Sequence, residues 1–266
     1  MRNGIGVLDS GVGGLTVARE IMRQLPQESI YYFGDTARCP YGPRPQEEIR
    51  AFTLQMIDYL SQLDIKALVI ACNTATAVVL KEVEQTSKIP VIGVIDPGAR
   101  TAIKETKTGK VGVIGTIGTI RSEAYEKALK RIDPTVDVYS MACPDFVPLV
   151  ESGIHDHQRV LSTVEATLKP MLENPIDTLI LGCTHYPLLS DYISQVMGPD
   201  VTLISSARET ARELSTVLAY QGILQEGCTL ERPRHQFFVS GKAAVMKEIA
   251  ESWLSAPLEI YQVDLK

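Results

Sequence analysis

The strongest constraint on the fold is a pattern that occurs twice. Residues 67–76 read Ala-Leu-Val-Ile-Ala-Cys-Asn-Thr-Ala-Thr, and residues 178–187 read Thr-Leu-Ile-Leu-Gly-Cys-Thr-His-Tyr-Pro. Each is a short apolar run typical of a buried strand, followed by a cysteine and by residues that can begin a helix. Open α/β sheets bind their ligands at the carboxyl ends of the strands. The pattern therefore predicts that Cys72 and Cys183 face each other across a cleft.

Short apolar runs alternate with amphipathic stretches along the whole chain, which is typical of parallel sheets with crossover helices. Residues 5–8 (Ile-Gly-Val-Leu) and their glycine-rich turn resemble residues 111–114 (Val-Gly-Val-Ile) and theirs. The two cysteine segments lie at nearly the same separation as these two strands. We therefore predict two similar α/β domains with mainly parallel sheets, related by pseudo-two-fold symmetry, with the active site in the cleft between them.

Charge and hydropathy narrow the class of partner. The chain of 266 residues carries a formal net charge of −6 and no lysine- or arginine-rich run, so a nucleic-acid partner is not expected. An anionic substrate would have to be held by local donors. No apolar stretch approaches the roughly 20 residues that span a bilayer, and residues 4–8 are too short for the apolar part of a signal peptide. We expect a cytoplasmic protein with no membrane partner.

The five cysteines are odd in number and include no Cys-x-x-Cys pair, which favours reduced thiols over a disulfide framework. Cys39, Cys143 and Cys228 fit the ordinary role of small apolar filler. Cys72 and Cys183 differ, because each stands between a strand and a helix start, where backbone N–H groups favour a thiolate. A thiol whose pKa lies near neutrality is a suitable carbon base.

Two such thiols suit one reaction in particular. The α-proton of an amino acid is very weakly acidic, and a single base would return it to the face that it left. One thiolate and one thiol on opposite faces would invert the centre and exchange protonation states for the reverse reaction. We therefore predict two-base chemistry by Cys72 and Cys183.

Four further ionisable residues have a functional and a structural interpretation. Asp9 should share the cleft edge with Cys72, but it could equally be the N-cap of the next helix. Asp35 also ends a strand and has the same ambiguity. Glu151 fits a solvated carboxylate at a helix end as well as a functional one. His185 could polarise or protonate the substrate, or be a structural histidine.

Metal and nucleotide sites are only weakly indicated. Cys183-x-His185 and His155-x-His157 supply ligand types, but their spacing is not that of a usual zinc site, so we predict no metal. Residues 9–14 form neither a dinucleotide-binding nor a Walker A motif, although their N–H groups could bind a carboxylate. Neutral donors at strand ends fit a small zwitterion with a second carboxylate, and equally fit helix caps: Ser10, Asn73, Thr74, Thr116, Thr119 and Thr184.

Five segments together resemble the motifs of bacterial glutamate racemases, in order and with similar spacing. They are Asp-Ser-Gly-Val-Gly-Gly (9–14), Gly-Asp-Thr-Ala-Arg-Cys-Pro-Tyr-Gly (34–42), Ala-Cys-Asn-Thr-Ala (71–75), Val-Glu-Ser-Gly (150–153) and Gly-Cys-Thr-His-Tyr-Pro (182–187). The resemblance implies an isomerase without a cofactor, which interconverts L- and D-glutamate and supplies D-glutamate for peptidoglycan.

The same resemblance implies roles for individual residues. Cys72 would deprotonate D-glutamate and Cys183 would deprotonate L-glutamate, while Asp9, Glu151 and His185 would assist proton transfer. The implied substrate contacts are Asp9, Ser10, Tyr41, Gly42, Asn73, Thr74, Thr184 and His185, to which we add Thr116 and Thr119 as donors at a strand end.

The resemblance also implies that the chain crosses twice between its domains, near residues 96 and 207. We expect a first domain of residues 1–96 plus 207–266 and a second of residues 97–206, with Asp96-Pro97-Gly98 as a turn or a crossing. Residues 205–209 depart from the Ser-Gly-type turn expected there, which affects only the local loop. Similar proteins from Gram-positive bacteria are often homodimers.

Three other functions remain open from the sequence. An aspartate racemase of the same superfamily would use the same chemistry and differ only in the pocket for the side-chain carboxylate. A two-lobed module that binds an amino acid without reacting it would need neither thiol for binding. A nucleotide-dependent enzyme is a third alternative, which racemisation in plain buffer would exclude.

Overall fold

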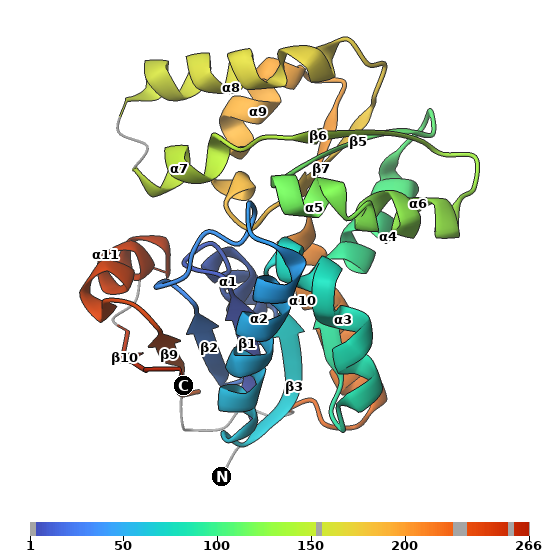
Figure 1. Ribbon diagram of the computed structural model, residues 1–266. Helices are drawn as coiled ribbons and strands as arrows, with labels where there is room; N and C mark the ends of the chain where they lie inside the picture. Colours follow the sequence, from blue (N-terminus) through green and yellow to red (C-terminus); the bar gives the residue numbers. More distant parts are fainter. Residues whose placement is uncertain (1–3, 153–155, 226–232, 255–257, 266) are drawn as a thin grey trace.

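The computed structural model describes residues 4–152, 156–225, 233–254 and 258–265 and contains two sheets of parallel strands (Figure 1). The first sheet has six strands in the order β10-β9-β2-β1-β3-β4. Its strands are β1 (Gly4–Asp9), β2 (Ile30–Gly34), β3 (Ile65–Ile70), β4 (Val91–Gly93), β9 (Gln236–Val239) and β10 (Ile260–Gln262). Cys228, His155 and Gly153 lie outside the described residues.

The second sheet has four strands in the order β6-β5-β7-β8. Its strands are β5 (Lys110–Gly115), β6 (Asp137–Ala142), β7 (Thr178–Gly182) and β8 (Thr202–Ser205). The first sheet contains the same order, β2-β1-β3-β4, with β1 matching β5 and β3 matching β7. This repeated order supports the predicted duplication, and the two parallel sheets confirm the predicted fold class.

Helices cover both faces of each sheet (Figure 1). They are α1 (Leu15–Gln24), α2 (Gln46–Ser61), α3 (Asn73–Thr86), α4 (Ile95–Glu105), α5 (Ile117–Arg121), α6 (Ala124–Ile132), α7 (Phe146–Glu151), α8 (His157–Leu172), a 3-10 turn η1 (Tyr186–Leu189), α9 (Ser190–Met197), α10 (Ser206–Tyr220) and α11 (Ala243–Leu254).

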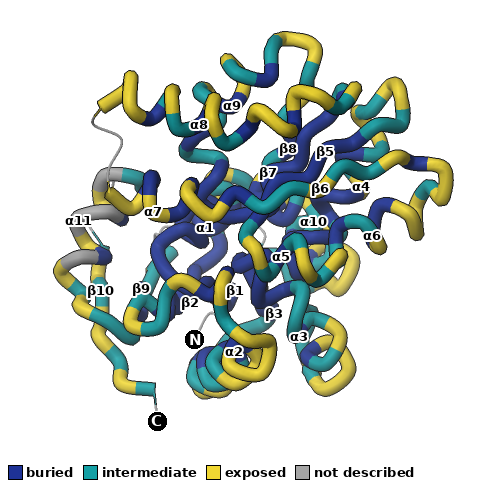
Figure 2. The backbone as a smooth tube through the Cα atoms, turned by 45° about the horizontal axis from the view of Figure 1, so that its top comes forward, coloured by how far each residue is buried: buried dark blue, intermediate teal, exposed yellow. Residues whose placement is uncertain are grey.

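The central strands read as continuous apolar runs because both of their faces are buried (Figure 2). In β3, Ala67 and Val69 belong to the core shared with α1 and α10, whereas Leu68 and Ile70 belong to the core shared with α2 and α3. The same alternation separates the two cores that flank the second sheet. Each sheet is therefore the middle layer of a three-layer sandwich.

The prediction of a turn at Asp96-Pro97-Gly98 is wrong, because these residues lie inside the first turns of α4. Proline is accepted there because the first N–H groups of a helix have no partner within the helix, so that its missing N–H costs nothing. Gly98 lies against Tyr125 and Ser206. The chain therefore passes from the first sheet to the second through a helix.

The domain boundaries near residues 96 and 207 stay a prediction. Both sheets agree with them, since β5 to β8 fall between the boundaries and the other strands fall outside. The two helices at the crossings are less easily assigned. The start of α4 follows β4, yet α4 packs on α6, while α10 contacts both α1 and α4.

None of the helices in the described part of the chain is long and apolar enough to cross a membrane.

Candidate active site

The carboxyl ends of the four central strands point toward a common region between the sheets (Figure 1). Each of these strands leads into the start of a helical segment: β1 precedes α1, β3 precedes α3, β5 precedes α5, and β7 precedes η1. Helix starts present unpaired N–H groups and a partial positive charge, which together favour an anion. Duplication of the sheet therefore brings several anion-binding chain segments to one place.

A small cavity of about 20 Å³ lies at this point, with room for roughly one water molecule. The described residues that line it include no lysine or arginine. They come from both sides of the cleft: Ser10, Cys39, Pro40, Tyr41, Gly42, Cys72, Asn73, Thr74, Thr116, Val147, Cys183, Thr184 and His185. The two predicted bases thus line the same cavity from opposite sheets.

Cys72 is the N-cap of α3, and its Sγ accepts the N–H of Ala75 at 3.4 Å. Its thiol lies 3.6 Å from the Ser10 hydroxyl oxygen, to which it donates. Burial and the nearby Asp9 carboxylate raise the pKa of Cys72 to about 12, and outweigh the hydrogen bonds that would lower it. This differs from the near-neutral pKa that the helix start alone predicts, so the resting Cys72 is a thiol.

Cys183 lies beside His185 and not beside a carboxylate. Its Sγ is 3.9 Å from His185 Nδ1, and His185 Nε2 lies 3.1 Å from Glu151 Oε1. Burial opposes a charged imidazole, but the hydrogen bonds to Cys183 and Glu151 outweigh it and raise the pKa of His185 to about 10. The bond to His185 lowers the pKa of Glu151. The imidazole of His185 therefore joins Cys183 to Glu151.

Asp9 is fully buried at the end of β1. Its carboxylate accepts the N–H of Gly11 at 3.0 Å, and the Thr184 hydroxyl donates to it at 3.4 Å. Burial raises the pKa of Asp9, whereas the positive charge of His185 opposes that rise. Asp9 therefore connects the Cys72 side of the site with residues that follow β7.

Asn73 offers a free donor to the cavity. Its Oδ1 accepts the Tyr125 hydroxyl at 2.7 Å, which fixes the orientation of the amide. Its Nδ2 is buried and has no hydrogen-bond partner within the described chain. A buried amide nitrogen without a partner is costly unless a ligand satisfies it, and a carboxylate oxygen is a suitable acceptor.

Three threonine hydroxyls form a cluster beside Asn73. Thr74 Oγ1 lies 2.8 Å from Thr116 Oγ1 and 3.1 Å from Thr119 Oγ1. Thr116 is also the N-cap of α5, where it accepts the N–H of Thr119 at 3.2 Å. The cluster joins the start of α3 to the start of α5, and hence the two sides of the cleft.

The Tyr41 hydroxyl is held by a residue outside the cavity, and its contact with the substrate stays a prediction. The Tyr41 ring lines the cavity, but its hydroxyl donates to the buried carboxylate of Asp35. What the cavity receives from this segment is therefore the ring and the neighbouring backbone. The Gly42 carbonyl accepts the N–H of Gly118 at 2.8 Å, which ties the segment to α5.

The structure gathers every predicted site residue in one region. Most line the cavity, while Asp9, Glu151 and Thr119 lie one contact behind it through Thr184, His185 and the threonine cluster respectively. No group of residues suited to hold a metal ion occurs among the described residues.

Sequence reasoning missed Cys39, Pro40 and Val147 as cavity residues. Cys39, predicted as filler, donates from its Sγ to Glu151 Oε1 at 3.7 Å. The sequence position of Cys39 and Pro40 after β2 could have revealed them, because the rule that ligands lie beyond strand ends applies to β2 as well as to β3. By contrast, Cys143 is fully buried in an apolar core, as predicted.

The Asp/Glu/Hydantoin racemase family matches residues 5–214 of the chain. A glutamate racemase of Bacillus cereus is 58% identical over 259 residues, which are 97% of this chain and 96% of the relative.

Solved structures agree with this match. A glutamate racemase isoform from Bacillus anthracis is 54% identical and superposes with a TM-score of 0.96, over 99% of this chain and 98% of that one. The glutamate racemase of Francisella tularensis, solved in complex with D-glutamate, is 34% identical with a TM-score of 0.92, over 100% of this chain and 98% of that one.

Proposed function

The chain belongs to the Asp/Glu/Hydantoin racemase family and racemises glutamate, and we propose that it does so with Cys72 and Cys183 as two opposed bases. The observation that carries this mechanism is that both thiols line one cavity, each from the end of the equivalent strand of its own sheet. A planar carbanion held between them can be protonated from either face.

Each enantiomer of glutamate is deprotonated by a different cysteine in this proposal. With L-glutamate, the thiolate of Cys183 removes the α-proton and the thiol of Cys72 protonates the opposite face. The raised pKa of Cys72 supports its role as the thiol in this step, and the charged His185 lies beside Cys183. After turnover, Cys72 is the thiolate and is ready for D-glutamate, so the cycle balances without any other acid or base.

Neutral donors hold the carboxylates of the substrate in this proposal. Asn73 Nδ2 and the cluster of Thr74, Thr116 and Thr119 lie on one side of the cavity, together with the N–H groups of the helix starts. Such groups bind anions without a formal positive charge. Asp9, Glu151 and His185 assist proton transfer at the two thiols in this proposal.

Acid and base both come from the two thiols, so the proposed mechanism uses no cofactor. Because it needs both thiols reduced, we place the enzyme in a reducing compartment, the cytoplasm, where D-glutamate would serve peptidoglycan synthesis. A homodimer stays a prediction.

The decisive experiment follows deuterium from solvent into glutamate. The wild-type protein in D₂O should exchange the α-proton of both enantiomers and racemise them. Cys183→Ser should exchange only D-glutamate and Cys72→Ser only L-glutamate, and each should lose racemisation by about 10³-fold or more. Cys143→Ala, which changes a buried cysteine outside the cavity, should remain active.

Other outcomes would support the alternatives. Faster turnover of aspartate than of glutamate would make the protein an aspartate racemase with the same two bases. Binding of glutamate with no deuterium at its α-carbon would leave only a binding module. Equal residual racemisation in both cysteine variants would overturn the two-base mechanism.

A further inference from the structure

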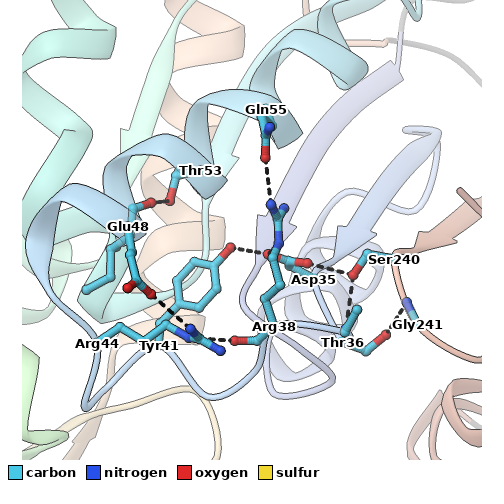
Figure 3. A network of polar contacts seen from close by, with 12 residues as sticks. Asp35, Thr36, Arg38, Tyr41, Arg44, Glu48, Thr53, Gln55, Ser240 and Gly241 are labelled. Carbon is cyan, nitrogen blue, oxygen red and sulfur yellow. Dashed lines mark hydrogen bonds and ion pairs between the residues drawn. The ribbon is translucent and has the colours of Figure 1, made fainter. Parts of the chain in front are cut away.

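Asp35 is a fully buried carboxylate that the proposed chemistry does not use (Figure 3). It follows β2 directly. Its Oδ1 accepts the Ser240 hydroxyl at 2.6 Å, and its Oδ2 accepts both Arg38 Nε at 2.7 Å and the Tyr41 hydroxyl. A buried carboxylate is costly unless it is paired and hydrogen-bonded, and here three side chains together supply its partners.

Two of these partners belong to one segment, residues 36–45, which we term the pocket loop. Arg38 is itself held in place, because it donates to Gln55 at 2.6 Å and its guanidinium lies 4.0 Å from the ring centroid of Phe52 on α2. Its backbone carbonyl accepts Arg44 Nε at 2.9 Å. Figure 3 shows the hydrogen bonds of Arg38 to Asp35 and Gln55 and that of Arg44 to the Arg38 carbonyl.

The third partner fastens the same loop to the end of strand β9. Ser240 follows β9, and its Oγ also accepts the N–H of Ala37 at 3.0 Å. The next residue, Gly241, donates its N–H to the Thr36 hydroxyl at 3.0 Å. Thr36 and Ala37, at the start of the pocket loop, are therefore hydrogen-bonded to the two residues that follow β9 beside Asp35.

The pocket loop supplies a wall of the cavity. Cys39, Pro40, Tyr41 and Gly42 all line it. Gly42 also lies against α5 on the other side of the cleft, where its carbonyl accepts the N–H of Gly118 at 2.8 Å. A side chain at position 42 would meet the Thr116 side chain at 2.8 Å. The position of this wall is thus set by close backbone contacts.

We propose that Asp35 is a positioning residue, whose carboxylate fixes the pocket loop through the Tyr41 hydroxyl and so places the loop backbone against bound glutamate. The inference depends on the proposed function, because it assigns a part of the same site. Tyr41 acts through its bond to Asp35 and its ring, and its hydroxyl does not contact the substrate.

A wall that contacts the substrate before and during the reaction contributes uniform binding, and its loss raises KM more than it lowers kcat. Asp35→Asn places an amide N–H₂ opposite donors, so that at least one of the three bonds is lost. We expect KM for both enantiomers to rise by about 10-fold or more, with kcat within about 3-fold. Hydrogen exchange of a peptide covering residues 36–45 should become faster.

Tyr41→Phe and the double variant that combines it with Asp35→Asn show whether Asp35 affects KM through the Tyr41 hydroxyl. Tyr41→Phe removes one oxygen atom and leaves Asp35 with Arg38 and Ser240, so it should raise KM in the same way but less. If the hydroxyl acts only through Asp35, the double variant should be little worse than Asp35→Asn alone. Additive effects of the two substitutions would show that the hydroxyl acts independently of Asp35, and would overturn the proposal.

Thr53→Val is the matched control. Thr53 is a fully buried polar residue on α2, and its hydroxyl donates to Ile49 of its own helix at 2.6 Å. The substitution keeps the shape of the side chain and removes a buried hydrogen bond near the loop without touching the Asp35 network. It should leave KM unchanged, even where it lowers the unfolding temperature.

The results separate the inference from the function on which it depends. Failure of the wild-type protein to racemise glutamate would remove the function itself. Normal KM in a folded Asp35→Asn variant, or a fall in kcat at constant KM, would overturn the positioning role alone. If Asp35→Asn does not fold, Tyr41→Phe decides the question, and an unchanged KM there counts against the proposal.

Discussion

At the scale of single residues, the two cysteines occupy equivalent positions in unlike surroundings. Cys72 is beside Ser10 and Asp9, where burial and a negative neighbour keep it protonated. Cys183 is beside His185, whose imidazole is charged at neutral pH. An enzyme that works in both directions must pass between two protonation states, and these unlike neighbours distinguish the two thiols.

The charge of His185 can be tested by titration. Its pKa is raised from an ordinary 6.5 to about 10, so its resonances in histidine-labelled protein should show an imidazolium up to about pH 10. Since the folded pKa is raised, the stabilisation that it provides is fully present below pH 6.5 and is lost as the pH rises through about 10.

Glu151→Gln removes the carboxylate from His185 and should lower the pKa of the imidazole, because one of the two hydrogen bonds that raise it is weakened. His185→Asn identifies the resonance by its absence. An imidazole that titrates near pH 6.5 in the wild-type protein would contradict the charged His185.

At the scale of elements, helix starts decide what the site contains. Cys72 and Thr116 are the N-caps of α3 and α5, so the same backbone geometry that ends a strand and begins a helix also points a thiol or a hydroxyl at the cavity. The start of α4 has a different task, since it carries the chain from one sheet to the other.

Gly98 in α4 provides a test of this helix. A Cβ at this position would meet Tyr125 and Ser206 at 3.4 and 3.5 Å, which are ordinary contacts. Because alanine is a better helix former than glycine, Gly98→Ala should stabilise the protein by about 0.5–1 kcal/mol, measured as a higher midpoint of urea unfolding.

Gly93, at the end of β4, is the contrasting position. A Cβ there would lie 2.5 Å from the Thr76 side chain, so Gly93→Ala should destabilise the protein. A lower midpoint for Gly98→Ala would mean that the start of α4 is not the helix described.

At the scale of the whole molecule, the cleft is closed. Gly42 and Gly118 are joined by a backbone hydrogen bond, and Thr16 Oγ1 donates to the Thr184 carbonyl at 3.0 Å. These bonds span the two sides around a cavity of about 20 Å³. Such a cavity holds water but not the ten non-hydrogen atoms of glutamate, so the two sides must separate to admit the substrate.

Solution scattering tests this closure. The free protein should show a larger radius of gyration than the protein saturated with D-glutamate, because the ligand favours the closed arrangement over the open one that admits it. Sodium chloride at matched ionic strength should cause no such change. Identical scattering curves with and without D-glutamate would contradict an opening of the cleft.

The sequence by itself determined the strands, the two cysteines at their ends and the repeated α/β unit, because buried parallel strands need continuous apolar runs and helix starts need small polar residues. For Asp96-Pro97-Gly98, the turn is wrong and the alternative of a crossing remains, since proline and glycine favour turns and yet are accepted in a first helical turn.

Only the tertiary structure decided the protonation and the hydrogen-bond partners of the site residues. The raised pKa of Cys72 depends on burial and on Asp9, the charge of His185 depends on Glu151 at 3.1 Å, and the Tyr41 hydroxyl is directed to Asp35 and away from the cavity. The first two depend on contacts between segments far apart in the chain, and the third depends on how one short loop folds on itself. Local sequence encodes which side chains lie at a strand end, whereas their pKa values and charges depend on which of them are in contact in the folded protein.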